Sequence, residues 1–276
     1  MTYWNAVLLG LVQGVAEFLP ISSSGHLAVL QNFLAIGDME NHMLFDVLLH
    51  LGTLAAVILA FWKDVREVVT EFARMLHIRR TPRGLRPNRR ERRLISFLII
   101  ATLPLIPAVF LSNVVESLYQ NTFFIGFAFI LTGFLLFAAD RMGHGNKDER
   151  SSTTADALVV GLAQAVAVVP GLSRSGTTIS FGMLRGFERS FAVKFSFLLS
   201  IPAVLGANLV SLIKVFSTGV EWSYVPMYLV GVACAFVSGY FAIYFLRLVV
   251  QRGKFGGFCY YCWGAGLVTL LLSLIS

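Results

Sequence analysis

The sequence predicts an all-α integral membrane protein, an inverted-topology repeat with six transmembrane helices and two re-entrant helix-break-helix pairs. The first observation is composition: 57% of the 276 residues are hydrophobic and only 13% are charged, whereas a soluble domain carries about 25% charged residues. The second is a series of apolar runs of about 20 residues, the length that crosses a bilayer. The third is a polar motif that recurs 151 residues further along the chain.

The first repeat is expected to cover residues 1–142. Residues 1–37 are apolar but interrupted by Pro20 and a serine–glycine run, so they predict a re-entrant pair whose helices are each too short to cross. Prolines are expected to kink the second of the three full spans. These spans are predicted at 45–62, 94–111 and 122–139, separated by a basic loop at 63–93 and a short loop at 113–121.

The second repeat follows a polar linker at 143–154 and covers residues 155–276. It opens with another re-entrant pair at 155–187, broken at Pro170-Gly171-Leu172. Three more spans are predicted at 191–213, 224–246 and 255–275. Because each repeat has an odd number of crossings, the two repeats must lie upside-down relative to each other within one membrane domain, and their breaks are expected to meet near the midplane.

The basic residues support this topology. Eleven of the 22 Lys and Arg lie between Lys63 and Arg93, which is typical of a cytoplasmic loop. Twenty of the 22 lie in four segments that we expect on the cytoplasmic side, namely 63–93, 141–150, 185–194 and 247–254. With these segments inside, both termini fall outside. Attraction to anionic lipid explains this charge, so nucleic acid is not an expected partner despite the net charge of +7. No basic residue precedes Lys63, so no cleavable signal peptide is predicted.

The repeated motif joins the two breaks. Gly10-Leu11-x-Gln13-x-Val15-Ala16 recurs as Gly161-Leu162-x-Gln164-x-Val166-Ala167, and Ser22-x-Ser24-Gly25 recurs as Ser173-x-Ser175-Gly176. Two positions differ between the copies. Glu17 corresponds to Val168, and Ser23 corresponds to Arg174, so one copy holds an acid and the other a base.

This combination of residues predicts a phosphate site. Serines after each break can cap the following helix, and helix N-termini present free backbone N–H groups to anions. Arg174 adds a guanidinium fork suited to phosphate. A serine or His26 could attack phosphorus, and Glu17, which shares a helix face with Gln13, could orient or deprotonate the nucleophile. Glu17 could instead be only a structural partner of Arg174.

Other polar residues in apolar surroundings are weaker candidates. Asp46 and His50 share a helix face, and a cap and a packing residue are the expected roles. Asp140, Glu188 and Arg189 are expected to be solvated at a membrane surface, and Asn208 to form an interhelical hydrogen bond. Cys259 and Cys262 have metal or redox spacing, but the expected role is packing, since no His or acid lies beside them.

The two motifs resemble those of the undecaprenyl-diphosphate phosphatases of bacterial cell envelopes. The family's Phe-Leu-Pro-x-Ser-Ser-x-Gly-His run, preceded by an acidic motif, matches Gln13 to His26, and its Pro-Gly-x-Ser-Arg-Ser-Gly run matches Pro170 to Gly176. The resemblance implies hydrolysis of undecaprenyl diphosphate, a polyprenyl lipid, to the monophosphate carrier used in peptidoglycan synthesis. It also implies a bacterial plasma-membrane location, a pocket toward the outer face, a homodimer and bacitracin resistance.

The resemblance also assigns site residues. Glu17, Ser23, His26 and Arg174 match catalytic positions, and the expected phosphate-binding set is Ser22, Ser24, Gly25, Ser173, Ser175, Gly176 and Thr178. A divalent cation, Mg²⁺ or Ca²⁺, is implied, with Glu17 and Gln13 as its candidate ligands. Gln13 stands where many members carry glutamate, and a neutral amide is a poorer ligand for these ions.

Three questions stay open at this point. Ser23 is an attractive nucleophile because it begins a helix beside Glu17, and His26 is the competing one. A lipid-phosphate flippase is the main alternative function, since inverted repeats with broken helices are a transporter architecture. A type-2 phosphatidic acid phosphatase would use similar short motifs, but its Lys-x6-Arg-Pro motif is absent from the sequence.

Overall fold

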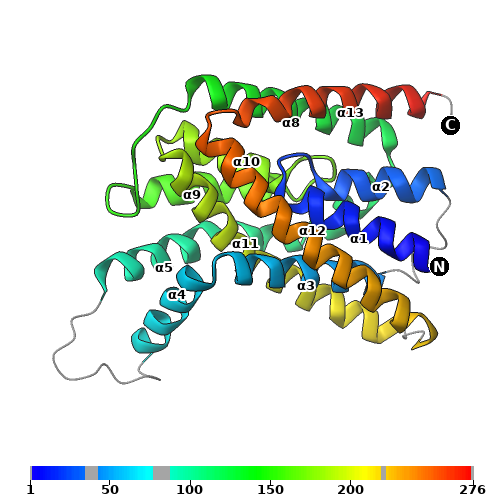
Figure 1. Cartoon of the computed structure of the whole chain (residues 1–276), viewed down its shortest axis with the longest axis horizontal. Coiled ribbons are helices and arrows are strands. Elements are labelled where there is room, and N and C mark those ends of the chain that lie inside the picture. The colour runs from blue at the N-terminus through cyan, green and yellow to red at the C-terminus, as the bar shows by residue number, and fades with distance from the viewer. Residues whose placement is uncertain (1, 35–42, 77–87, 219–221, 275–276) are drawn as a thin grey trace.

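The computed structural model describes residues 2–34, 43–76, 88–218 and 222–274. Within these ranges the chain is helical, and β structure is confined to an isolated bridge between Lys147 and Phe187. Figure 1 shows the start of α1 (Tyr3–Phe18) and the end of α13 (Phe258–Ser273) at one end of the molecule. At the opposite end lie α4 (Trp62–Met75) and the start of α5 (Arg89–Thr102).

The first half begins with two short helices separated by a break. Leu19 leaves the helical region and the chain resumes its helix at Ser23, where α2 runs back along α1. Pro104 stands between α5 and the short α6, so the proline kink predicted for this span coincides with a two-residue break in the helix. The remaining helices of this half are α2 (Ser23–Leu34), α3 (Met43–Ala60), α6 (Leu105–Val109), α7 (Ser112–Tyr119) and α8 (Thr122–Met142).

The second half repeats this order after the linker. Thr153 caps α9 in a capping box with Asp156, and the next break separates α9 from α10. The long α11 contains Pro202, which the sequence analysis did not single out. The helices of this half are α9 (Thr154–Val166), α10 (Arg174–Leu184), α11 (Arg189–Thr218), α12 (Val225–Gln251) and α13, with single 3-10 turns at Trp222–Tyr224 and Phe255–Gly257.

Six segments of the described chain are long and apolar enough to cross a membrane, which confirms the predicted multi-pass membrane protein. They are Met43–Ala60, Arg89–Val109, Thr122–Met142, Arg189–Ile213, Trp222–Gln251 and Phe255–Ser273. Their outward faces carry large apolar side chains. On α8, Phe123, Phe127 and Phe134 are each more than half exposed at helical spacing. Such a stripe would be costly in water and is suited to lipid.

Two predicted loops are partly helical. The basic segment 63–93 contains α4, and the segment 113–121 contains most of α7. In α4 the apolar side chains Val65, Val68 and Phe72 recur at helical spacing, and α4 packs against α5. The density of basic residues hid this period. Residues 77–87 of the predicted loop lie outside the described residues.

The packing exchanges elements between the halves. Helix α1 lies along α12, α9 lies against α5, and α8 lies along α13. Figure 1 shows α8 and α13 side by side across one edge. Phe18, at the end of α1, is buried edge-on against Phe197 of α11 in the main core. The first break is therefore held by helices from the other half of the chain.

Candidate active site

The two breaks touch each other at their glycines. A Cβ on Gly25 would lie 3.0 Å from the Cα of Gly171, and one on Gly176 would lie 3.1 Å from the Cβ of Pro20. The Ser175 hydroxyl also donates to the carbonyl oxygen of Leu19 at 3.3 Å. Only residues without side chains permit this approach, so the glycines of both motifs bring the two copies together.

Both helices after the breaks begin with a serine cap. Ser22 Oγ accepts from the backbone N–H of Gly25 at 3.2 Å, and Ser173 Oγ accepts from that of Gly176 at 3.0 Å. The sequence did not decide which serine caps each helix, and the structure shows that Ser22 and Ser173 are the caps. The Oγ atoms of Ser22 and Ser24 lie 3.4 Å apart, and the Oγ atoms of Ser173 and Ser175 lie 3.3 Å apart. The repeated motif thus has one local geometry in both copies.

Ser22 is the strained residue of the first break. Its φ of 68° lies in the left-handed region, the one such value outside glycine in the described chain. A side chain in this region costs roughly 1–2 kcal/mol, and such strain clusters at functional sites. The second break uses Gly171, with φ 88°, where no side chain opposes the turn.

Glu17 and Arg174 form an ion pair across the breaks. Glu17 lies in the last turn of α1 with its side chain 6% exposed, and Arg174 is the first residue of α10. Arg174 Nη2 donates to Glu17 Oε1. A guanidinium has five N–H donors, so the pair with one carboxylate oxygen leaves others for a further anion.

The second oxygen of Glu17 binds two neutral donors. Glu17 Oε2 accepts from Ser23 Oγ at 2.6 Å and from Gln13 Nε2 at 3.1 Å. His50 Nε2 lies 3.9 Å from the same oxygen. Ser23 and Ser24 are half-buried, and the Arg174 side chain is 20% exposed, so the hydroxyls and the fork are partly accessible beside the buried acid.

His26 has a partner at each ring nitrogen. Nδ1 lies 2.7 Å from the carbonyl oxygen of Ser22, and Nε2 lies 2.8 Å from the hydroxyl of Tyr261. A carbonyl only accepts, so Nδ1 carries hydrogen and neutral Nε2 accepts from the tyrosine. The two rings stack with centroids 5.7 Å apart, and Phe129 packs edge-on against the imidazole.

Sequence reasoning missed Tyr261, although the signal was present. Tyr261 lies between Cys259 and Cys262, a pair noted only for its spacing. Both cysteines are free and buried, as the packing interpretation predicted. The Cys262 thiol donates to the carbonyl oxygen of Pro20 at 3.4 Å, so the start of α13 packs directly on the first break.

Thr178 is placed differently from the other predicted phosphate ligands. Its side chain is buried, and its hydroxyl bonds the backbone carbonyl of Arg174 at 2.9 Å and Ser196 Oγ of α11 at 2.5 Å. Thr132 of α8, also missed, accepts from the backbone N–H of Ser173 at 3.3 Å and so supports the second break. These two threonines fasten α10 to its neighbours.

Several weaker candidates have a different place from the one expected. His50 faces Glu17, where the sequence predicted a packing role. Asp140 and Arg189 are partly buried and pair with each other at 2.6 Å, where both were expected to be solvated. Asn208 Nδ2 has no hydrogen-bond partner in the described structure, so its amide nitrogen does not form the predicted interhelical bond.

The residues do not fit a resident divalent cation. Mg²⁺ and Ca²⁺ need about six oxygen ligands with several carboxylates or waters. Both Glu17 oxygens already accept from protein donors, one of them cationic, so the only candidate ligand atom left free is the buried Gln13 Oε1, which has no hydrogen-bond partner in the described structure. Among the described residues, no three His, Cys, Asp or Glu side chains lie close enough together to hold a metal.

Known proteins match nearly the whole chain. The family described as bacitracin resistance protein BacA matches residues 6–268. A relative from Alkaliphilus metalliredigens, named undecaprenyl-diphosphatase, is 41% identical over the full length of both chains. A second relative of that name, from Syntrophotalea carbinolica, is 40% identical, and the match covers 96% of this chain and 97% of the relative. A third, from Halothermothrix orenii, is 37% identical, and the match covers 99% of each chain.

Proposed function

This chain belongs to the bacitracin resistance protein BacA family, and we propose that it hydrolyses undecaprenyl diphosphate to undecaprenyl phosphate and inorganic phosphate. The observation that carries the proposal is the contact of Glu17 with both Ser23 and Arg174. An acid, a nucleophile and a phosphate-binding fork thus meet at the start of two helices. The relatives' printed name supports the substrate.

The terminal phosphate is proposed to bind between the two helix starts. The caps from Ser22 and Ser173 use one N–H group of each first turn, and the earlier N–H groups have no intrahelical partner. These N–H groups and the Arg174 fork suit the doubly charged end of a diphosphate. Ser24 and Ser175 add hydroxyls beside them.

Ser23 is the proposed nucleophile. Its hydroxyl donates to Glu17 at 2.6 Å, so Glu17 can take the proton as Ser23 Oγ attacks the terminal phosphorus. The bond from phosphorus to the bridging oxygen breaks, undecaprenyl phosphate leaves, and a phosphoserine remains. Water then attacks that phosphorus and releases phosphate, with the proton returned to Ser23. Arg174 offsets the charge on the phosphoryl oxygens in both steps.

His26 is proposed to position the break rather than to attack. Both of its nitrogens are already hydrogen-bonded, whereas the Ser23 hydroxyl points at a base. Trapping the phosphoenzyme separates the two mechanisms. Phosphoserine resists acid, and phosphohistidine is acid-labile. An acid-labile adduct that persists in Ser23→Ala would transfer the nucleophile role to His26.

We infer that the implied Mg²⁺ or Ca²⁺ requirement would depend on ligands from the diphosphate itself, because the protein residues do not form a cation cage. No step above depends on the ion. Phosphate release with the metal chelated by EDTA, and after its replacement by Mg²⁺ or Ca²⁺, tests the requirement directly.

The inverted, re-entrant arrangement is likewise a proposal. It is supported by the exchange of helices, because α1 packs on α12 while its counterpart α9 packs on α5, the counterpart of α12. It places both termini outside, the basic segment 63–93 in the cytoplasm and the site open to the outer face of a bacterial plasma membrane. The homodimer implied by the family likeness can be tested by cross-linking in native membranes.

A flippase is not favoured, because lipid movement has no need of a nucleophile beside its base. Purified protein in detergent micelles distinguishes the two functions, since a flippase needs two compartments. The proposal expects phosphate release from undecaprenyl diphosphate in micelles, lost in Ser23→Ala. A well-folded protein that releases none, with divalent cation present, would contradict the proposed hydrolysis.

A further inference from the structure

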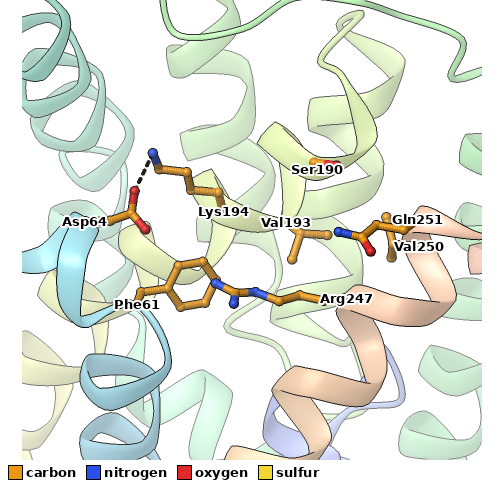
Figure 2. Close-up of a pocket in the computed structure, with 8 residues that line it drawn as sticks. All are labelled: Phe61, Asp64, Ser190, Val193, Lys194, Arg247, Val250 and Gln251. Carbon is orange, nitrogen blue, oxygen red and sulfur yellow. Dashed lines mark ion pairs between the residues drawn. The ribbon is translucent and has the colours of Figure 1, made fainter.

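A second polar cavity lies away from Glu17, at the ends of three spans. It encloses about 230 Å³ between the α3–α4 junction, the start of α11 and the end of α12. Figure 2 shows its residues, with Phe61 and Asp64 on one side and Arg247 and Gln251 on the other. The candidate spans of α3 and α12 end at Ala60 and Gln251, so we expect this cavity to lie at the level of lipid headgroups.

Three charged side chains line the cavity: the acid Asp64 and the bases Lys194 and Arg247. Lys194 donates to Asp64 at 2.5 Å and to Glu149 at 3.3 Å, and Glu149 also pairs with Arg90 at 2.6 Å. Lys194 is therefore paired with acids, and Glu91 lies near both Lys194 and Arg90 as well. Arg247 has no acid within ion-pair distance in the described parts of the chain, and Figure 2 shows Lys194 turned toward Asp64 instead.

Arg247 is held in a geometry that suits an anion. Its guanidinium lies 3.8 Å above the centroid of the Phe61 ring. Stacking covers one face of the guanidinium but leaves the N–H groups at its edge free to donate. Phe61 is only 3% exposed and packs edge-on against Phe197, so this platform is rigid.

Other donors and nonpolar surface surround the same space. Gln251 lies one turn after Arg247 on the same face of α12, and Ser190 lies across the cavity. The volume is below the roughly 300–1,000 Å³ of sites that enclose drug-sized ligands, so it suits a headgroup. Tyr244, one turn before Arg247, is 62% exposed beside it and can contact acyl chains.

We propose that this cavity binds the phosphate of an anionic membrane lipid, with Arg247 as its main ligand. The lipid source follows from the depth of the cavity and the exposed aromatic surface next to it. Basic pockets between transmembrane helices bind such headgroups elsewhere. The site contains no residue of the Glu17 cluster, so it is separate from the hydrolytic site.

Native mass spectrometry of the full chain in detergent tests the proposal. Phosphatidylglycerol and phosphatidylcholine with identical acyl chains are added at equal concentration, and retained lipid is counted. Wild type is expected to retain phosphatidylglycerol preferentially. Arg247→Gln is expected to weaken this retention about tenfold, because charge-assisted hydrogen bonds are lost. Arg247→Lys keeps the charge but not the fork, so it should lose only part of it.

Arg252→Gln is the matched control, since Arg252 is exposed on the same end of α12, outside the cavity. It removes the same charge and is expected to retain lipid like wild type. Equal loss in both glutamine variants, or no loss in either, would overturn the proposal. Inorganic phosphate at equal concentration should not displace the lipid, and displacement would assign the cavity to free phosphate. If Arg247→Gln does not fold, Arg247→Lys decides the question. Phosphatidylglycerol retention in Arg247→Lys equal to that of wild type would also overturn the proposal.

Discussion

Glu17 joins two parts of the chain that are 157 residues apart. Its oxygens bind the base of the other motif copy, the hydroxyl of Ser23 and the amide of Gln13. A carboxylate at membrane depth is costly unless it is paired. The same contacts that remove this cost also orient the acid toward the hydroxyl, so stability and chemistry depend on the same atoms.

Arg174→Lys is expected to reduce phosphate release about a hundredfold or more, as loss of an oxyanion donor does elsewhere. A lysine ammonium can pair with Glu17 or bind phosphate, but it lacks the planar fork that does both. Turnover of undecaprenyl diphosphate in micelles is the measurement. Arg150→Lys, the same change at an exposed site, is the control. Near-normal turnover in Arg174→Lys would show that a point charge is sufficient.

Tyr261→Phe is expected to reduce turnover about tenfold, because His26 Nε2 loses its hydrogen-bond donor while the stacked ring is retained. The ring of His26 can then rotate away from Ser22. Tyr260→Phe removes a hydroxyl from the adjacent exposed position and should have no effect. The imidazole ¹⁵N shifts should change in Tyr261→Phe alone. Identical spectra in the two variants would rule out this positioning role.

At the scale of elements, small residues decide which helices meet. Gly10 of α1 faces the backbone of Gly231 in α12, and Gly161 of α9 faces the backbone of Ala101 in α5. Each break is therefore positioned by a helix from the other half of the chain. The repeated glycine has a packing role, which the motif comparison alone did not reveal.

Gly161→Ala is expected to lower thermal stability and turnover, since its Cβ would lie 2.5 Å from the carbonyl oxygen of Ala101. Backbone cannot move aside as a side-chain end can. Gly264→Ala is the matched control on α13, where nothing lies within 4 Å, and it should be neutral or stabilising by about 0.5–1 kcal/mol. Thermal unfolding in detergent compares the two. Equal stability of both variants would contradict the proposed close approach.

A buried acid fastens the linker to α9 and α10. Burial alone would raise the pKa of Asp156, but hydrogen bonds from Lys147, Thr153 and Arg185 hold this pKa at about 2, below the ordinary 3.8. Since the folded pKa is the lower one, the stabilisation is complete above about pH 4 and is lost as the pH falls toward 2.

Asp156→Asn is therefore expected to lose about 2 kcal/mol of stability at pH 7, and the difference from wild type should shrink below about pH 4. Thermal unfolding across this pH range is the measurement. Glu188→Gln removes one negative charge from an exposed site nearby and is the control. A difference that is independent of pH would show that the carboxylate charge is not what stabilises the linker.

At the scale of the whole molecule, Figure 1 shows the start of α1 and the end of α13 at one end, with α4 and the start of α5 at the other. The basic segment that contains α4 and the start of α5 thus lies at the end opposite the two termini, as the proposed topology requires. Labelling of exposed residues that the structure describes can test this topology directly.

Labelling with a membrane-impermeant maleimide is expected to modify Gln120→Cys in intact cells and Ser151→Cys only after permeabilisation. Both positions are exposed. Positive segments stay on the cytoplasmic side, which places residue 151 inside. The unmodified chain, with its three native cysteines, measures the background. The opposite pattern would invert the topology, and labelling of both in intact cells would refute it.

The sequence by itself determined the helical membrane class, the six spans, the two breaks and the residues that gather between them. Apolar length and a repeated motif are local properties, and they can be read without knowing the packing. Helix α7 was missed because it has only eight residues, and most of α4 was missed because its many charges hid the apolar spacing.

Only the tertiary structure decided which atoms meet. Tyr261 reaches His26 from a position 235 residues away, and His50 faces Glu17 from a separate helix. It also turned the Thr178 hydroxyl toward Ser196 and stacked the Arg247 guanidinium on the Phe61 ring. These contacts depend on close packing between distant helices, and that packing is set by side-chain shape across the whole bundle, which local pattern does not encode.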